Sequence, residues 1–279
     1  MNTLVIGGTG TTGSRVAAAL RERGAGLRVA TRHPRPDRPD QVRFDWADPA
    51  THDPATAEVD RVYLIPPLGA VDPLPVVEPF LTRAVDRGVR RVVLLSSSAV
   101  APDTPGLGAL QRAVRDLVPQ WAVLRPSWFL QNLTREHVLA RGIRERGEIV
   151  TATGSGRVAL VDADDIAAVA VRALLDPVSH DTDHVITGPR AVDYAEVAET
   201  ITEVTGRPVR HRSVSAGELT ALLVADGMPE PFAAVLAALD ETIRDGAEDR
   251  VTTTVADLTG RPPRSLREFV TAHRDAFAA

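Results

Sequence analysis

Short runs of apolar, mostly β-branched residues alternate with amphipathic stretches through the first half of the chain. In the stretches between runs, Val77, Phe80, Leu81 and Ala84 fall on one helical face, and residues 107–117 repeat the helical spacing. Strands that alternate with helices favour a parallel sheet with crossover helices. The pattern therefore predicts an α/β fold, a Rossmann-like doubly wound parallel sheet. The expected strands are residues 4–6, 27–30, 42–44, 62–65, 92–95 and 122–124.

The alternation changes after Arg125-Pro126. The later pattern predicts helices over residues 130–146, 166–175, 192–206, 216–226 and 232–244, with a short β region near residue 150. We therefore expect a nucleotide-binding domain over residues 1–150. A smaller α/β substrate lobe, partly interleaved with the first domain, is expected over residues 151–279.

A glycine-rich turn, Gly7-Gly8-Thr9-Gly10-Thr11-Thr12-Gly13, joins the first expected strand to the first expected helix. Glycines allow the backbone to approach a pyrophosphate, and the following helix directs amide N–H groups and its positive end at the same point. Glycines are often only turn residues, but this context indicates a dinucleotide site. The residues expected to bind the cofactor here are Gly7, Gly10, Thr11, Thr12 and Gly13.

The end of the second strand indicates which nucleotide binds. It reads Ala30-Thr31-Arg32-His33, with no carboxylate to hold the ribose 2′-hydroxyl of NAD. The Arg32 guanidinium suits a 2′-phosphate instead, which favours NADP(H), although a solvated loop charge is the alternative. Asp45, after the third strand, is equally compatible with binding the adenine amino group and with a turn.

Ligands of such sheets bind outside the carboxyl ends of the strands. Pro66, Pro67 and Ser96 follow the fourth and fifth strands, so we expect them beside the nicotinamide. The prolines are also typical strand terminators.

Composition narrows the chemistry. The 279 residues contain no cysteine, and the formal net charge of −5 with dispersed basic residues argues against nucleic acid as a partner. Neither a leader sequence nor an apolar run of roughly 20 residues is apparent, so we expect a cytoplasmic protein without a membrane partner. No lysine occurs, because every residue of the Lys+Arg total of 32 is arginine. Asp162, Asp164 and Asp165 precede a helix and are better explained as caps than as metal ligands, so no metal is expected.

Several stretches resemble the NmrA-like group of atypical short-chain dehydrogenases, and within it the festuclavine and agroclavine dehydrogenases of ergot alkaloid biosynthesis. They are residues 7–13, 64–67, 88–96, 122–132, 194–198, 226–229 and 259–263, and Leu124-Arg125-Pro126-Ser127-Trp128-Phe129 is the most specific part. The resemblance runs nearly end to end. It implies hydride transfer from NADPH to a small organic acceptor, which in the ergot enzymes is an iminium carbon. Other members of the group act on quinones or sense the nucleotide.

Typical short-chain dehydrogenases protonate the product with a tyrosine that a lysine four residues later makes more acidic. This chain cannot do so, because it has no lysine and because Tyr63 and Tyr194 lie outside the helix after Ser98. An iminium or quinone-like acceptor therefore fits best, since hydride addition to an iminium carbon yields a neutral amine. If an acid is needed, the candidates are Ser97, Ser98, Asp103 and His137, each of which also has a structural explanation.

Trp128 and Phe129 follow the sixth strand, where they are expected either to stack on a planar substrate or to pack in the core. Asn132 is expected to bind substrate or backbone. The arginine-only, alanine-rich composition suggests a bacterium with a GC-rich genome, hence a reductase of bacterial natural-product metabolism, acting as a monomer or homodimer on a small molecule. The alternatives are a nucleotide-sensing regulatory protein and a redox-neutral cyclase or isomerase on the same fold.

Overall fold

The computed structural model describes residues 2–102 and 104–278. The chain folds into two compact units. The first comprises residues 1–126, 163–185 and 257–260, and the second comprises residues 127–162, 186–256 and 261–279. The expected single boundary at residue 150 differs from these breaks, because a helix and a strand after residue 162 return the chain to the first unit.

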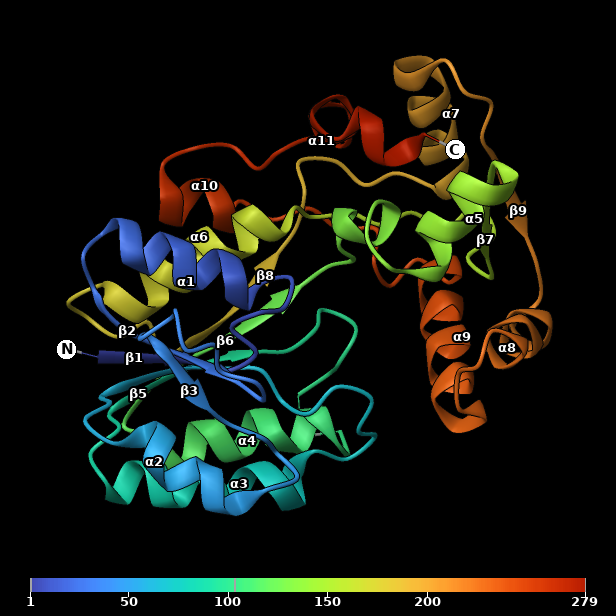
Figure 1. Cartoon of the computed structure of the whole chain (residues 1–279). Coiled ribbons are helices and arrows are strands. Elements are labelled where there is room, and N and C mark those ends of the chain that lie inside the picture. The colour runs from blue at the N-terminus through green and yellow to red at the C-terminus, as the bar shows by residue number, and fades with distance from the viewer. Residues whose placement is uncertain (1, 103, 279) are drawn as a thin grey trace. The chain divides into compact units, whose positions relative to one another are not determined.

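The first unit is built on a seven-stranded sheet in the order β3-β2-β1-β4-β5-β6-β8 (Figure 1). All of the expected strands form, in parallel pairs such as Leu4 opposite Arg28 and Val62 opposite Val92. The chain reverses its direction of sheet growth between β1 and β4, which is the point where ligands bind in doubly wound sheets. The strands are β1 (Asn2–Val5), β2 (Gly26–Thr31), β3 (Gln41–Arg43), β4 (Arg61–Leu64), β5 (Arg91–Leu95), β6 (Gln120–Pro126) and β8 (Thr182–Ile186).

Helices cover both faces of this sheet (Figure 1). One face carries α1 (Gly13–Glu22) and α6 (Ala163–Leu175), and the other carries α2 (His52–Thr56), α3 (Leu74–Asp86) and α4 (Leu107–Leu117). Strands β1, β4 and β5 are largely buried, and Val77, Phe80 and Leu81 of α3 insert into the core as the helical spacing predicted. The doubly wound parallel sheet is confirmed.

The second unit contains a two-stranded parallel sheet, β7 (Glu148–Thr151) with β9 (Arg210–Ser213), and most of the remaining helices. These elements are η2 (Leu130–Leu133), α5 (Val138–Arg146), α7 (Tyr194–Thr205), α8 (Ala216–Ala225), α9 (Glu230–Arg244), α11 (Leu266–Ala272) and η3 (Arg274–Phe277). Helix α10 (Thr254–Thr259) crosses the division between the units, and η1 (Pro49–Thr51) belongs to the first.

The prediction of one continuous helix over residues 130–146 is wrong. A 3-10 turn ends at Leu133, and α5 begins at Val138 after His137, whose ring Nδ1 accepts a hydrogen bond from the Leu139 N–H at 3.2 Å. This side-chain cap satisfies a helix N-terminal amide that would otherwise lack a partner, and it fixes a new helix start. Among the described helices, none combines the length and apolar composition that a bilayer crossing requires.

Candidate functional site

The glycine turn between β1 and α1 is so tightly packed that side chains would not fit at two of its glycines. A Cβ on Gly13 would lie 2.2 Å from the Gly7 carbonyl oxygen, and a Cβ on Gly8 would lie 2.5 Å from a methyl carbon of Val29. Gly7 itself has φ +68°, in the left-handed region that glycine tolerates. A hydrogen bond from Gly10 N to Gly7 O at 2.9 Å closes the turn. Glycine is therefore required at position 13, where the start of α1 packs directly against the backbone of Gly7.

The start of α1 offers amide N–H groups at this turn. No acceptor within residues 2–102 and 104–278 is present for the backbone N–H groups of Thr12 and Gly13. Arg15 braces the turn, because its guanidinium donates to the Thr11 carbonyl at 2.7 Å and to the Asp164 carboxylate at 2.5 Å. The helix N-terminus thus presents donors and partial positive charge to the space outside the sheet. A cradle of this shape fits a pyrophosphate.

Arg32 and Asp45 lie at the ends of neighbouring strands. Arg32, directly after β2, is exposed and has no ion-pair partner among the described residues. Asp45, after β3, accepts a hydrogen bond from Ala47 N at 3.0 Å through one carboxylate oxygen, as a turn residue does. The guanidinium of Arg32 is therefore available to a ligand. In Asp45, one of the two carboxylate oxygens already accepts a hydrogen bond from the loop that contains it.

Pro66 and Pro67 follow β4 and are half-buried. The preceding residue, Ile65, contacts the glycine turn, since its side chain would lie 3.0 Å from a Cβ on Gly7. Its carbonyl accepts a hydrogen bond from the Trp46 indole at 3.2 Å. The end of β4 and the glycine turn are thus packed together, as the topology predicted.

The three serines after β5 have different surroundings. Ser96 is buried, and its hydroxyl oxygen accepts a hydrogen bond of 2.8 Å from Nε2 of Gln111, a fully buried residue of α4. The Ser97 hydroxyl oxygen accepts from Ala99 N at 3.3 Å, which is a local turn contact. Ser98 is buried and extends the pairing with β6 through its N–H to the Pro126 carbonyl at 2.9 Å. Ser96 is thus held by a side chain from another element, α4.

Gln111 was not predicted as a site residue, although it lies in α4, the helix after Ser98 where the tyrosine of a typical short-chain dehydrogenase is expected. Its side-chain Oε1 is buried without a hydrogen-bond partner within the described chain. An unsatisfied buried amide oxygen is destabilising by about 1–3 kcal/mol. The remaining buried face of α4 carries Leu110 and Val114, so an amide at this position stabilises the fold less than an apolar residue would. Within the described chain its side chain forms one hydrogen bond, to the hydroxyl of Ser96.

The other predicted side chains belong to the second unit. Trp128 and Phe129 are half-buried, and their backbones bridge to Val161, with Val161 N donating to Trp128 O at 2.8 Å. Asn132 is half-buried in η2, and no described residue bonds its side-chain amide. Stacking of Trp128 and Phe129 on a substrate stays a prediction, and so does a hydrogen bond from Asn132 to a substrate.

His137 has a structural function that weakens it as an acid. Its Nδ1 caps α5, and burial lowers the pKa of His137 to about 4. The imidazole is therefore neutral at pH 7 and has no readily released proton. Asp103, the remaining acid candidate, lies outside the described residues.

Neither tyrosine replaces the missing acid. Tyr63 is fully buried in the middle of β4, and burial raises its pKa strongly, with the nearby Thr12 side chain offsetting only part of the shift. Burial also raises the pKa of Tyr194, which belongs to the second unit, and the Asp240 carboxylate raises it further. Both hydroxyls thus hold their protons more tightly than a free tyrosine does.

The acidic residues around position 164 bind arginines and an amide. Asp162 is fully buried and accepts from Gln131 Nε2 at 2.8 Å and from Arg264 at 2.7 Å, while Asp164 pairs with Arg15. In the described part of the chain no group of three or more histidine or acidic side chains is arranged to hold a metal ion.

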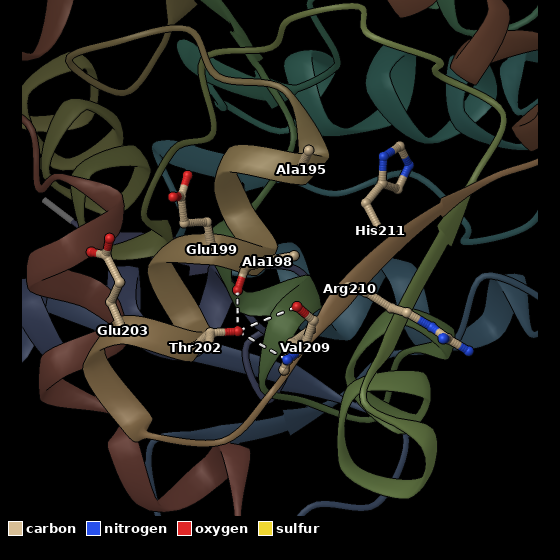
Figure 2. Close-up of a pocket in the computed structure, with 8 residues that line it drawn as sticks. All are labelled: Ala195, Ala198, Glu199, Thr202, Glu203, Val209, Arg210 and His211. Atoms are coloured by element: carbon tan, nitrogen blue, oxygen red, sulfur yellow. Dashed lines mark hydrogen bonds between the residues drawn. The ribbon is translucent and has the colours of Figure 1, made fainter.

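A broad hollow lies within the second unit. It occupies about 580 Å³ between α7 and β9 and is lined by Ala195, Ala198, Glu199, Thr202, Glu203, Val209, Arg210 and His211 (Figure 2). Thr202 spans its floor, where its hydroxyl accepts from Val209 N at 2.9 Å and donates to Ala198 O at 2.9 Å. The hollow is broad and open, and Arg210 points away from it in Figure 2. It does not have the enclosed apolar character of a nucleotide or drug-sized ligand site.

Curated relatives match the chain over almost its full length, although no protein-family model matches it. The oxidoreductase YesF of Bacillus subtilis is 46% identical over 272 residues, which cover 97% of this chain and 94% of that protein. Agroclavine dehydrogenase of Claviceps fusiformis is 37% identical, with 99% of each chain covered. The NAD(P)H azoreductase of Xenophilus azovorans is 34% identical, again with 99% of each chain covered.

Solved structures show the same fold. Triphenylmethane reductase of Citrobacter sp. in complex with NADP(H) superposes with a TM-score of 0.81 at 24% identity, covering 98% of this chain and 100% of that one. The Escherichia coli quinone oxidoreductase QOR2 in complex with NADPH gives a TM-score of 0.83 at 22% identity, with 98% and 99% covered.

Identities above 30% over the whole length go beyond a shared fold. The resemblance seen in residues 7–13 and 122–132 extends from end to end of the relatives, as expected from the sequence. The chain belongs to this family of oxidoreductases, the NmrA-like group of atypical short-chain dehydrogenases that contains the agroclavine and festuclavine dehydrogenases.

Proposed function

We propose that this oxidoreductase is an NADPH-dependent reductase that transfers a hydride to a small organic acceptor: an imine or iminium, a quinone or a conjugated carbonyl. The observation that carries the proposal is the glycine cradle, in which Gly13 lies against the Gly7 carbonyl and two amide N–H groups have no acceptor among the described residues. Relatives named as a clavine dehydrogenase and an NAD(P)H azoreductase support it. Both names describe the reduction or oxidation of organic nitrogen compounds.

The residues of the cradle fit a dinucleotide. The amides of Thr12 and Gly13 and the positive end of α1 would bind the pyrophosphate, and Arg32 would bind a ribose 2′-phosphate. When bound, reduced nicotinamide supplies the hydride. Pro66 and Pro67 would limit water at the reactive end, and Ser96, held by Gln111, would orient a polar group there.

The lack of a conventional acid restricts the acceptor. With no lysine in the chain, with Tyr63 buried in the sheet and with His137 neutral, the described residues assigned to the site offer no strong proton donor. Reduction of an iminium needs no proton, and reduction of a quinone gives a delocalised oxyanion that solvent protonates. Both acceptors fit a site whose polar groups are hydroxyls and amides.

The same missing acid favours a second candidate, a nucleotide-sensing regulatory protein or a redox-neutral enzyme on this fold. These functions need the cradle but no net hydride transfer. Acceptor-dependent oxidation of NADPH separates them from a reductase. If turnover is found, bacterial natural-product metabolism is the proposed setting, since the arginine-only composition suggests a GC-rich genome.

Replacing Arg32 with alanine should lower the affinity for NADPH by at least about tenfold and leave the affinity for NADH almost unchanged, because a charged hydrogen bond contributes about 1.5–3 kcal/mol. Fluorescence titration of both proteins with each nucleotide measures this. Arg35→Ala is the matched control, since Arg35 is exposed but already paired with Asp37 at 2.8 Å. Equal losses for NADPH and NADH, or none, would refute the selectivity assigned to Arg32.

A further inference from the structure

Gln111 of α4 is a fully buried residue whose amide group is only partly hydrogen-bonded. Its Nε2 donates to the Ser96 hydroxyl oxygen at 2.8 Å, whereas its buried Oε1 has no hydrogen-bond partner within the described chain. The other large side chains on the buried face of α4, Leu110 and Val114, are apolar. A buried amide in this condition destabilises a fold relative to an apolar side chain of the same size. Stability alone therefore gives no reason for glutamine at position 111.

The direction of this hydrogen bond determines what the Ser96 hydroxyl can do. Since Gln111 Nε2 is the donor, the Ser96 oxygen is the acceptor, and the hydroxyl proton points elsewhere. No atom of residues 2–102 and 104–278 accepts this proton. The backbone of Ser96 is held as well, because its N–H donates to the Leu124 carbonyl of β6 at 2.7 Å. Ser96 is thus a hydrogen-bond donor whose position is set by two neighbouring elements.

Ser96 lies at the edge of the sheet where nucleotides bind. It directly follows β5, which pairs with β4, and β4 pairs with β1, the strand that leads into the glycine turn. The carboxyl ends of these parallel strands share one edge, and a ligand of a doubly wound sheet lies outside it. The strands, the turn and α4 all belong to the first unit. Ser96 is 8% exposed and Gln111 is 0% exposed, so a ligand can touch the serine but not the glutamine.

We propose that Gln111 is a positioning residue, which by donating to the Ser96 oxygen directs the Ser96 hydroxyl to donate to a carbonyl oxygen of a bound ligand. The inference rests on the proposed function in taking that ligand from the reaction. The carbonyl belongs either to the carboxamide of nicotinamide or to a quinone acceptor. Two hydrogen bonds in series strengthen each other. A donor at a quinone oxygen also stabilises the negative charge that this oxygen gains as the hydride adds to the ring.

Gln120 is a glutamine with a structural function in the same sheet, and it supplies a matched control. It lies at the start of β6, opposite Arg91 of β5, and thus at the other end of the strands from Ser96. Its Oε1 accepts from Arg91 Nε at 3.0 Å, and Arg91 is itself buried. The Gln120 amide oxygen therefore satisfies a buried charged donor, whereas the Gln111 amide oxygen satisfies no donor in the described part of the chain.

Gln111→Met keeps the length of the side chain and removes its hydrogen bond to Ser96. We expect the melting temperature to be maintained or raised. Either the affinity for NADPH or kcat/KM for 2-methyl-1,4-naphthoquinone should fall by about threefold to tenfold, as for the loss of one neutral hydrogen bond. Ser96→Ala should give the same loss, and the double variant should lose no more than either single variant, because Gln111 acts through Ser96. Gln120→Met should instead lower the melting temperature and leave both ligand parameters unchanged.

Two measurements distinguish the sources of the carbonyl. Fluorescence titration with NADPH detects a contact with the carboxamide, and the rate of NADPH oxidation with the quinone detects a contact with the acceptor. Unchanged values in both measurements, additive losses in the double variant, or a melting temperature that falls as far in Gln111→Met as in Gln120→Met would overturn the inference. If the wild type binds NADPH but does not oxidise it with the quinone, the proposed function fails for this acceptor. The titration then decides the inference alone, and an NADPH affinity unchanged in Gln111→Met and Ser96→Ala overturns it.

Discussion

Replacing Gly13 with alanine should abolish binding of NADPH, with a loss of affinity of at least about 100-fold. The added Cβ would lie 2.2 Å from the Gly7 oxygen and 2.7 Å from the Gly7 carbonyl carbon, and no flexible side chain is present to move aside. Either the turn opens or α1 shifts, and both changes displace the amides of Thr12 and Gly13 that face the cradle. Overpacking of this kind is also destabilising by about 1–3 kcal/mol. Titration with NADPH and urea unfolding measure the two effects.

Gly217→Ala is the matched control for this substitution. Gly217 lies in α8, and a Cβ there would meet no atom within 4 Å. Alanine at an open helical position should be neutral or stabilising by about 0.5–1 kcal/mol, with nucleotide affinity unchanged. If Gly13→Ala bound NADPH as tightly as the wild type, the cradle would not be the pyrophosphate site.

Replacing Asp162 with asparagine should lower the free energy of unfolding by about 3 kcal/mol, because breaking a buried ion pair costs about 3–5 kcal/mol and Arg264 is partly exposed. The fully buried Asp162 carboxylate accepts from Arg264 at 2.7 Å and from Gln131 at 2.8 Å, and it therefore joins three separate segments of the second unit. An asparagine keeps the shape but presents an NH₂ group to one of these donors. Urea denaturation followed by circular dichroism gives the change.

Asp164→Asn supplies the comparison two residues away. Asp164 is 45% exposed at its side chain and pairs with Arg15, so solvent screens much of the interaction. Its loss should cost no more than about 1 kcal/mol. Equal losses of unfolding free energy in the two variants would contradict the larger stabilisation assigned to the buried Asp162 carboxylate.

The centre of the sheet could be predicted because its strands β1, β4 and β5 are buried on both faces. Runs such as Val62 to Leu64 and Val92 to Leu94 are continuously apolar, which is the pattern of a central parallel strand. Strand β8 was not predicted, since Thr182, Asp183 and His184 make it polar. It lies at the edge of the sheet, where Asp183 pairs with Arg115 at 2.8 Å. Edge strands need only part of the apolar pattern.

The tight glycine turn between β1 and α1 was predictable for a local reason, since all of its residues are close in sequence. Contacts between distant residues were not. Gln111 meets Ser96 across 15 residues, and Asp240 meets Ala152 across 88. In the sequence Asp240 is an ordinary acidic residue on an amphipathic helix. Only the fold shows that its neighbour Glu241 is paired with arginine, whereas no arginine in the described part of the chain pairs with Asp240.

The most direct measurement is the rate of NADPH oxidation at 340 nm with a panel of acceptors, comparing cyclic iminium salts, quinones and conjugated carbonyls with a blank that lacks acceptor. The account predicts oxidation that depends on at least one iminium or quinone and that is lost in Gly13→Ala. Tight binding of NADPH without acceptor-dependent oxidation for any of the three classes would contradict it, and would favour a nucleotide-sensing protein or a redox-neutral enzyme.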